Sequence, residues 1–268
     1  MVTRSTRSWA AGSHAMTASG DKATRVRAMF ARIAPRYDLM NRLMTGGRDQ
    51  AWRRTAARAA APPRGTLALD LATGTGDLAH ALLAEAGVRG VIGVDFVEGM
   101  LHLGRAKAEA VGERRVRFLA GDALALPFAD ASFGCVASAF LLRNLADLRA
   151  GLAEMRRVTA PGGAVVALEI TQPTLPGWRQ AFRLYFHRVV PAVGALIAGN
   201  REAYTYLPQS VDRFVTPAEL ARLMEAAGLR DVSVRRVGLG TVTIHVGRVG
   251  RVGQAPSITS AGRPGAAA

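Results

Sequence analysis

Apolar and polar positions along residues 21–247 follow two patterns, short apolar runs and a helical spacing. Short apolar runs predict buried strands at 67–71, 91–94, 116–119, 132–139 and 164–168, while two later runs, 232–234 and 241–244, predict a hairpin. Between them, segments with apolar residues three or four positions apart predict amphipathic helices. Because strands and helices alternate in this order, we expect an α/β fold with a mostly parallel sheet of seven strands and helices on both faces.

The helical segments also carry start and stop signals. Helices are predicted at 21–33, 97–110, 147–159 and 178–198. Pro35 ends the first, and Pro191 interrupts the last. A further helix begins after Thr216, with Glu219 at its third position as in a capping box. Residues 161–163, Pro-Gly-Gly, predict a turn before the fifth strand.

The most informative stretch joins the first strand to its helix. The glycine loop Gly74-Thr75-Gly76 follows the apolar run, and helical spacing resumes at Asp77. Glycine allows a sharp turn and the close approach of a ligand, and the free N–H groups of a helix start attract negative charge. We therefore expect Gly74, Thr75 and Gly76 to bind a cofactor. A tight turn without a ligand is the alternative.

Residues at the following strand ends narrow the choice of cofactor. Asp95 ends the second strand, about 20 residues after the loop, where a carboxylate accepts hydrogen bonds from ribose hydroxyls. Asp122 and Ala123 follow the third strand, where Asp122 can meet an adenine amino group, and Ala139 ends the fourth. NAD and S-adenosylmethionine both contain ribose and adenine. Asp70, placed before the loop where it can steady a cationic amino-acid group, favours S-adenosylmethionine.

Composition separates a folded domain from two polar ends. We expect disordered ends at 1–20 and 248–268, because neither has an apolar pattern, and Met16 is an alternative start. No signal peptide or run long enough to span a bilayer is expected. The domain at 21–247 is predicted to comprise a helical cap (21–64), a cofactor-binding core (65–170), substrate-side helices (171–230) and a closing hairpin (231–247).

Two segments depart from the alternation and are candidates for the substrate side. Residues 37–54 are rich in Tyr, Met, Asn and Trp, and predict either a helical flap over the cofactor or a packed cap without function. The segment 178–198 is expected either to pack in the core or to meet a lipid tail or membrane surface. Its predicted apolar face comprises Trp178, Phe182, Tyr185, Phe186 and Val189.

The net charge of +15 is concentrated at the ends of the chain. Residues 1–64 carry a net charge of +10, whereas residues 65–245 carry only +2. The basic ends could meet anionic lipid or nucleic acid. Arginine enrichment explains the charge equally well, since Lys22 and Lys107 are the only lysines. A single cysteine, Cys135, excludes a disulfide framework, and no Cys/His cluster has the spacing of a metal site.

Several motifs together resemble the ubiquinone/menaquinone biosynthesis C-methyltransferase family. The similar stretches are Tyr37-Asp-x-Met40-Asn41 with Gly47 and Trp52, Arg157-Val-Thr-Ala-Pro161-Gly162-Gly163 with Glu169, Leu142-Arg143-Asn144, Glu202-Ala-Tyr204-x-Tyr206-Leu-Pro-x-Ser210, and the ending Ile244-His245-Val-Gly247. The resemblance spans residues 24–247, and it is more specific than the glycine loop alone.

The resemblance implies a class I S-adenosylmethionine-dependent methyltransferase fold. It also implies methyl transfer to a ring carbon of a prenylated hydroquinone, with demethylmenaquinol as the first candidate. No metal is expected, because the leaving group departs neutral. The ring hydroxyl must lose a proton, which requires a base close to it. Arg143 and Asn144 are expected there, with Arg143 stabilising the anion, and Tyr37 is expected to gate the pocket.

Two departures from the family pattern concern the substrate. Asp49 stands where many relatives have His, and Leu141 replaces a usual Gly, which adds bulk beside the expected substrate site. Leu141 leaves open the methylation of another small aromatic or quinone-like molecule. The basic charge leaves open the methylation of nucleic acid, and a non-catalytic cofactor-binding role in a complex is the third alternative.

The expected location and partners follow from the substrate. A prenylated quinol resides in the bilayer, so we expect a cytoplasmic enzyme that works at the inner face of the plasma membrane. Basic residues of the 178–198 segment, Arg179, Arg183 and Arg188, are expected near anionic headgroups. We expect no nucleic-acid partner, because the central part of the chain is nearly neutral, and we consider a homodimer.

Overall fold

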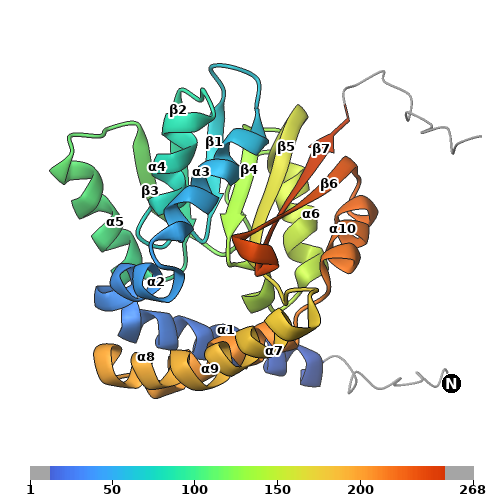
Figure 1. Ribbon diagram of the computed structural model, residues 1–268. Coiled ribbons are helices and arrows are strands. Elements are labelled where there is room, and N and C mark those ends of the chain that lie inside the picture. The colour runs from blue at the N-terminus through green and yellow to red at the C-terminus, as the bar shows by residue number, and fades with distance from the viewer. Residues whose placement is uncertain (1–12, 251–268) are drawn as a thin grey trace, which may run out of the picture.

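The computed structural model describes residues 13–250 of the chain (Figure 1). The first 12 residues of the predicted N-terminal arm and residues 251–268 of the predicted tail lie outside the described residues. Within the arm, residues from Ser13 onward are helical, because the helix α1 runs Ser13–Ile33. The start of this helix was therefore predicted too late, since Ala and Met are good helix formers and no proline interrupts 13–20.

Seven strands form one sheet in the order β3-β2-β1-β4-β5-β7-β6. Their bounds are β1 Leu67–Leu71, β2 Gly90–Asp95, β3 Val116–Ala120, β4 Phe133–Ala139, β5 Thr159–Ile170, β6 Leu229–Val237 and β7 Val242–Val249. Neighbouring strands from β3 to β5 are parallel, whereas β7 is antiparallel to both β5 and β6. The predicted seven-stranded sheet with a closing hairpin is confirmed.

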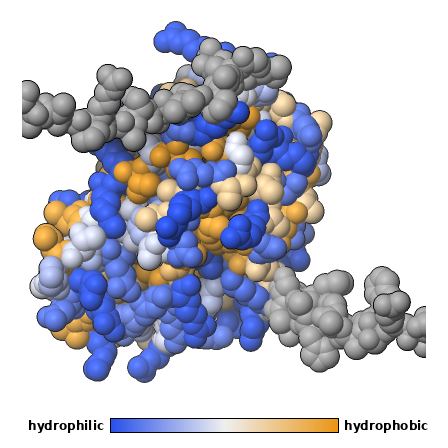
Figure 2. Space-filling view, turned by 90° about the vertical axis from the view of Figure 1, so that its right-hand side faces the viewer, coloured by the Kyte–Doolittle hydropathy of each residue, from blue (hydrophilic) through white to orange (hydrophobic). Residues whose placement is uncertain are grey.

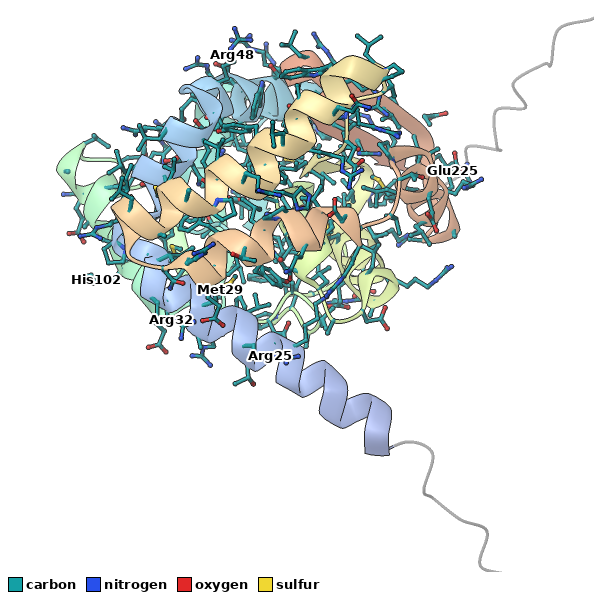
Figure 3. All side chains as sticks on the ribbon, turned by 60° about the horizontal axis from the view of Figure 1, so that its bottom comes forward. Arg25, Met29, Arg32, Arg48, His102 and Glu225 are labelled. Atoms are coloured by element: carbon teal, nitrogen blue, oxygen red, sulfur yellow. The ribbon has the colours of Figure 1, made fainter. Side chains whose placement is uncertain are left out.

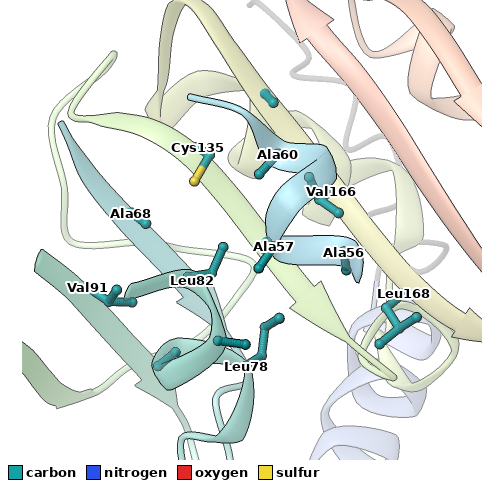
Figure 4. Packing of buried hydrophobic residues seen from close by; sticks show 14 of the residues in the cluster. Ala56, Ala57, Ala60, Ala68, Leu78, Leu82, Val91, Cys135, Val166 and Leu168 are labelled. Atoms are coloured by element: carbon teal, nitrogen blue, oxygen red, sulfur yellow. The ribbon is translucent and has the colours of Figure 1, made fainter. Parts of the chain in front are cut away.

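One face of the sheet is covered by α3 (Arg48–Ala60), α4 (Asp77–Glu85) and α5 (Glu98–Ala110). Small side chains of α3 allow this helix to lie close to the strands, as Figure 4 shows for Ala56, Ala57 and Ala60 above Val166 and Leu168. Gly104 brings α5 against the ring of Phe118, because a Cβ at that glycine would lie 2.6 Å from the ring.

The other face packs against α6 (Leu148–Val158) and α10 (Pro217–Ala226). Alternate residues of each central strand point to the two faces, so that Cys135 and Ala137 join the α3–α4 side while Val136 joins the α6–α10 side. The helix α10 starts as predicted, since the Thr216 side chain accepts the N–H of Glu219. It packs on this face rather than on the substrate side to which its segment was assigned.

The remaining helices form a cap over the carboxyl edge of the sheet. They are α1, α2 (Tyr37–Thr45), α7 (Pro176–Leu184), α8 (Val190–Ala198) and α9 (Arg201–Asp212). Figure 3 looks onto this cap and shows α7, α8 and α9 lying across it, with Met29 where α1 meets α9. Arg32 of α1 lies at the outer edge and pairs with Glu202 of α9 at 2.8 Å.

Two local predictions differ from the structure because of backbone irregularities. Residues 160–163 form a bulge within a longer β5 and not a turn before it, since Thr159 pairs with Phe133 but Ala164 pairs with Cys135. A π-helical turn at Tyr185–Val189 changes the rotation of the α7–α8 segment. Phe182 and Phe186 are consequently buried, as predicted, whereas Val189 is exposed and Val190 takes the buried position.

The sheet continues two residues beyond the predicted end of the domain. β7 reaches Val249, and Arg248 donates hydrogen bonds to the carbonyls of Ala59 and Ala60 at the end of α3. Hydrogen bonds to the last carbonyls of a helix satisfy groups that the helix cannot pair itself. Across residues 13–250, no helix combines the length and apolar character needed to cross a bilayer.

Candidate active site

The glycine loop turns sharply between β1 and α4. Gly74 and Gly76 have φ values of 56° and 86°, in the left-handed region that glycine enters without strain. A side chain at Gly76 would also collide with the Phe118 ring, because a Cβ there would lie 2.8 Å from it. At Gly74 a Cβ would meet only Tyr37, at 3.8 Å, so the loop faces open space on the cap side.

The first of two cavities, here called the loop cavity, lies beside this turn. Five of the predicted cofactor-binding residues line it, together with residues of α1, β2, α5 and the β4 end. The five are Gly74, Asp95, Asp122, Ala123 and Ala139. The structure therefore brings these strand ends together around one cavity, and their role in cofactor binding stays a prediction.

Asp95 is the central acidic group of the loop cavity. Its side-chain oxygens accept the backbone N–H groups of Gly74 and Val97, both at 2.9 Å. The N–H of Phe96 also donates to this carboxylate, and since a carboxylate has about four acceptor positions, acceptor capacity remains for a ligand hydroxyl. Burial raises the pKa of Asp95, while the N–H groups of Val97 and Gly74 oppose that rise. As hydrogen-bond acceptors, these carboxylate oxygens fit the hydroxyls of a ribose.

Thr75 and Gly76 do not line the loop cavity, contrary to the sequence prediction. The Thr75 hydroxyl lies 2.7 Å from Asp38 of α2 and 3.2 Å from the ammonium of Lys107. Lys107 also pairs with Asp38 at 2.9 Å and with Asp77 at the start of α4. These residues therefore fasten the cap helix α2 to the glycine loop.

The other lysine of the chain contacts the opposite side of the cap. Lys22 of α1 donates a hydrogen bond to the carbonyl of Leu145 at 2.6 Å, just beyond the Arg143-Asn144 turn.

Asp70 lies beneath the glycine loop and does not line the loop cavity. It accepts the Thr73 hydroxyl at 2.6 Å, and burial raises its pKa to about 7. Its predicted contact with the cationic group of a cofactor stays a prediction.

The second cavity, here called the cap cavity, lies between the cap helices and the sheet edge. It has about 960 Å³ of empty space including its mouth, against about 880 Å³ for the loop cavity. Its apolar lining includes Met29, Ile33, Met44, Trp52, Ile170, Phe182 and Phe186. Its polar lining includes Asn41, Asp49, Arg143, Asn144, Tyr204 and Tyr206. The lining therefore suits a mainly apolar molecule with a few polar groups.

Four residues belong to the walls of both cavities: Phe30, Tyr37, Phe140 and Asn144. Ligands bound in the two cavities would therefore lie next to each other at these four residues. Phe140 has a φ of 64°, a left-handed conformation that is unusual for a bulky residue, and its N–H donates to Leu168 at 2.7 Å. Strained backbone of this kind concentrates at functional sites.

Arg143 is held by a buried ion pair. Its Nη1 lies 3.0 Å from Glu169 Oε2, while Glu169 Oε1 accepts the N–H of Leu142 at 2.6 Å. The Arg143 guanidinium also stacks 5.7 Å from the centroid of Phe140. Burial raises the pKa of Glu169, and Arg143 opposes that rise.

Asn144 and Tyr37 are fixed beside Arg143. The Asn144 amide donates to the carbonyl of Phe140 at 3.1 Å, and its side-chain oxygen accepts the Tyr206 hydroxyl, also at 3.1 Å. Tyr37 begins α2 and packs edge-on against Phe30. Burial raises the pKa of Tyr37, which keeps the phenol neutral. The three predicted catalytic residues are thus brought together at the border of the cavities.

Several buried polar atoms around the cap cavity have no hydrogen-bond partner among residues 13–250. They are Asn41 Nδ2, Arg143 Nε and the Tyr204 hydroxyl. Buried polar groups are almost always paired in folded proteins. Three such atoms around one cavity would suit a ligand with polar groups.

Sequence reasoning missed part of this site and misplaced one residue. Phe30, Asn41, Phe140 and Tyr204 line the cap cavity although no site role was predicted for them, and no periodicity or spacing marks them as cavity residues. Leu141 lines the loop cavity and not the expected substrate side. Leu141 packs in the core beneath α6 and α10, whereas Phe140 packs against the core on the α3–α4 side, so the two side chains lie on opposite faces of the sheet end. In the described part of the chain, no group of His, Cys, Asp and Glu is arranged to hold a metal ion.

Known proteins with similar sequences are demethylmenaquinone methyltransferases. A demethylmenaquinone methyltransferase of Thermus thermophilus is 49% identical over 219 residues, which cover 82% of this chain and 99% of that relative. A demethylmenaquinone methyltransferase of Deinococcus radiodurans is 48% identical over 227 residues, covering 85% of this chain and 93% of that one.

A solved structure and a family pattern complete the comparison. The crystal structure of a SAM-dependent methyltransferase from Aquifex aeolicus shares the fold, with a TM-score of 0.55 at 17% identity over 79% of this chain and 97% of that one. The pattern of the ubiE/COQ5 methyltransferase family matches residues 16–249. The fold is that of class I S-adenosylmethionine-dependent methyltransferases, and the chain belongs to the ubiE/COQ5 methyltransferase family.

Proposed function

We propose that this protein transfers the methyl group of S-adenosylmethionine to a ring carbon of demethylmenaquinol, which yields menaquinol. The observation that carries the proposal is the pair of cavities meeting at Tyr37, Phe140 and Asn144. One offers acceptors for a ribose and an adenine, and the other offers an apolar wall with polar groups at the border. The relatives named demethylmenaquinone methyltransferase support this substrate.

The loop cavity is proposed to hold the cofactor. Asp95 would accept the ribose hydroxyls and Asp122 the adenine amino group, while the small side chains of Ala123 and Ala139 would leave room for the base. Gly74 lets the backbone approach the ligand without a side chain between them. When bound, S-adenosylmethionine supplies an electrophilic methyl group on a sulfonium. The residues of the chain must therefore bring a ring carbon into line with that methyl, which is mainly a task of orientation.

Arg143, Asn144 and Tyr37 are proposed to act on the quinol ring. A quinol carbon becomes nucleophilic when the neighbouring hydroxyl loses its proton. The guanidinium of Arg143 stabilises the resulting oxyanion, because its buried surroundings strengthen the attraction. Asn144 keeps the turn in place through Phe140 and Tyr206. Tyr37 stays neutral and closes the border between ring and cofactor.

The apolar part of the cap cavity is proposed to receive the start of the prenyl tail. Phe182 and Phe186 stack on each other with ring centroids 5.0 Å apart and line the cavity. Met29 and Met44 add flexible apolar surface that adapts to a branched chain. The predicted lipid-tail role of this segment is therefore retained for Phe182 and Phe186, but not for the exposed Val189.

We propose that the cap rests on an anionic membrane surface. Leu184, Val189 and Leu196 of the α7–α8 segment are exposed, with 64%, 44% and 87% of their surface in solvent. The basic residues Arg183 and Arg188 of the same segment are also exposed. Figure 2 shows a largely hydrophilic lower border at the level of the cap, with scattered hydrophobic residues. Such a mixture suits an interface where apolar side chains enter the headgroup region and arginines meet lipid phosphates.

A complementation experiment tests the proposed function in a cell. A bacterial strain that lacks its demethylmenaquinone methyltransferase accumulates demethylmenaquinone. Expression of this chain should restore menaquinone in the lipid extract, whereas an Arg143→Ala variant expressed to the same level should not. If the wild-type chain leaves demethylmenaquinone unchanged while folding and binding S-adenosylmethionine, another substrate must be sought.

A further inference from the structure

Asp49 is the only carboxylate on the wall of the cap cavity within the described residues. That wall holds no histidine, lysine or cysteine, and its other ionisable groups are Arg143 and four tyrosines. Asp49 lies near the start of α3 and is 1% exposed. A methyl transfer to a quinol carbon needs an acceptor for the hydroxyl proton, and neither a guanidinium nor a neutral phenol accepts one readily.

The two oxygens of Asp49 have different surroundings. Oδ2 lies 3.3 Å from Arg53 Nη1 and 3.4 Å from Gln50 Nε2. Oδ1 lies 3.2 Å from the Thr45 hydroxyl, which is closer to the carbonyl of Asn41, at 2.8 Å. Oδ1 therefore keeps acceptor capacity for a ligand, whereas Oδ2 anchors the carboxylate in place.

Arg53 links Asp49 to the border of the two cavities. Its guanidinium lies 5.4 Å from the centroid of the Phe140 ring, and Phe140 lines both cavities. Arg143 stacks on the same ring at 5.7 Å. The Phe140 ring therefore has two guanidinium groups around it, one paired with Asp49 and the other with Glu169. Of these two carboxylates, only Asp49 faces the cap cavity.

We propose that Asp49 is the general base of the reaction and takes the proton from the quinol hydroxyl next to the reacting carbon. This inference rests on the proposed function. The O–H electron pair stays with the quinol oxygen, and the proton neutralises Asp49. Arg143, which lines the cap cavity, stabilises the quinolate that forms.

The methyl transfer forms one carbon–carbon bond, breaks one carbon–sulfur bond and releases the ring hydrogen as a proton. The ring carbon uses its electron pair for the new bond to the methyl group, and the sulfur retains the pair of the bond that breaks. The methylated carbon then releases its ring hydrogen to water as a proton, which restores the aromatic ring. Asp49 returns its proton to the quinol oxygen. One proton is released to solvent in each turnover, and Asp49 is again a carboxylate.

Asp49→Asn tests this role, because it keeps the shape and the acceptor oxygen but cannot take a proton. We expect kcat on demethylmenaquinol to fall by about 100-fold or more, the usual contribution of a general base. Binding of tail-less naphthoquinol to the cofactor-free protein, measured by calorimetry, should stay within a factor of a few. Asp49→His and Asp49→Glu should recover part of kcat, since both restore a proton acceptor.

A matched control is Glu154→Gln on α6. Glu154 also pairs with an arginine, Arg157 at 2.7 Å, but it lines neither cavity, so this change should leave kcat unaltered. Formate added to Asp49→Ala should raise its rate, because it supplies a carboxylate in the space left free. Thermal unfolding of every variant shows whether the fold is intact.

The outcomes separate the inference from the proposed function. A wild-type protein that does not methylate demethylmenaquinol overturns both. A wild-type protein that does, together with an Asp49→Asn variant of near-normal kcat, overturns only the role of Asp49. Parallel loss of kcat, naphthoquinol binding and thermal stability in Asp49→Asn, without recovery in Asp49→His or Asp49→Glu, assigns Asp49 to the structural ion pair with Arg53 and also overturns it.

Discussion

The guanidinium of Arg143 lies 3.0 Å from the carboxylate of Glu169, at the carboxyl edge of the sheet and away from solvent. Glu169 is the last but one residue of β5, whereas Arg143 lies in the turn after β4, so two neighbouring strands bring the pair together. The ion pair holds Arg143 against Phe140 on the wall of the cap cavity. This arrangement supports a role for Arg143 towards the substrate and not towards the cofactor.

Arg143→Ala should therefore retain cofactor binding and lose turnover. Arg143 does not line the loop cavity, so the dissociation constant for S-adenosylmethionine should stay close to the wild-type value. Loss of a buried charge that stabilises a developing anion should lower kcat by about 100- to 1000-fold. Calorimetry and steady-state rates measure the two effects. A near-normal kcat would make Arg143 a packing residue.

Protein stability serves as the control for this variant. Removing Arg143 leaves Glu169 buried without its partner, which costs about 3–5 kcal/mol when the charge is retained. Burial already raises the pKa of Glu169, so the carboxyl will take up a proton and limit the cost. Arg143→Ala should consequently be less destabilised at pH 6 than at pH 8, as urea unfolding would show.

Asp95→Asn should weaken cofactor binding. The amide keeps one acceptor oxygen but loses the charge-assisted hydrogen bonds to a ribose diol, which contribute about 1.5–3 kcal/mol. The dissociation constant for S-adenosylmethionine should rise by about ten- to hundredfold. Asp95 also holds the N–H groups of Gly74 and Val97, so thermal unfolding must accompany the calorimetry. An unchanged affinity in a folded variant would remove Asp95 from the cofactor site.

Asp70 should make protein stability depend on pH. Burial raises the pKa of Asp70 to about 7, so the native state keeps a proton that the unfolded state releases at lower pH. The free energy of unfolding should therefore fall between about pH 4 and pH 7, by roughly 1.4 kcal/mol for each unit of the pKa difference. Asp70→Asn should remove this fall and be more stable than wild type at pH 8. Equal pH profiles of unfolding for both proteins would refute the buried, proton-holding state of Asp70.

The tail-binding role of the α7–α8 segment can be separated from its packing role. Replacing both Phe182 and Phe186 with Ser should reduce kcat/KM on a long-tailed quinol more than on a tail-less analogue, because only the former uses the apolar wall. Replacing the exposed Leu184 and Leu196 with Ser should instead reduce binding to anionic vesicles. Equal losses on both quinols would assign Phe182 and Phe186 to core packing alone.

The central sheet could be predicted from the sequence because its signals are local. Apolar runs predicted β1, β2 and β4 to within one residue at each end, and the Thr216 cap marked the start of α10. Strand ends of a parallel sheet share one edge, which explains why Asp95, Asp122 and Ala139 line one cavity, while their contacts with a cofactor stay a prediction.

The walls of the site could not be predicted in the same way, since they depend on contacts between distant segments. Phe30 and Phe140 become neighbours of both cavities only when α1 folds over the strand ends. Thr75 was placed in the cofactor site by its loop, but its hydroxyl is used by Asp38 and Lys107, 37 and 32 residues away. Val189 was misassigned because a π-helical turn breaks the 3.6-residue period from which its face was derived.

The central claim is that the methyl group of S-adenosylmethionine reaches a ring carbon of demethylmenaquinol. The most direct test incubates the purified protein with reduced demethylmenaquinone and S-adenosylmethionine carrying a deuterated methyl group, followed by mass spectrometry of the extracted lipid. The account predicts menaquinone with all three deuterium atoms in its ring methyl group, and none with Arg143→Ala. Unlabelled lipid, or label bound to an oxygen of the ring, would contradict it.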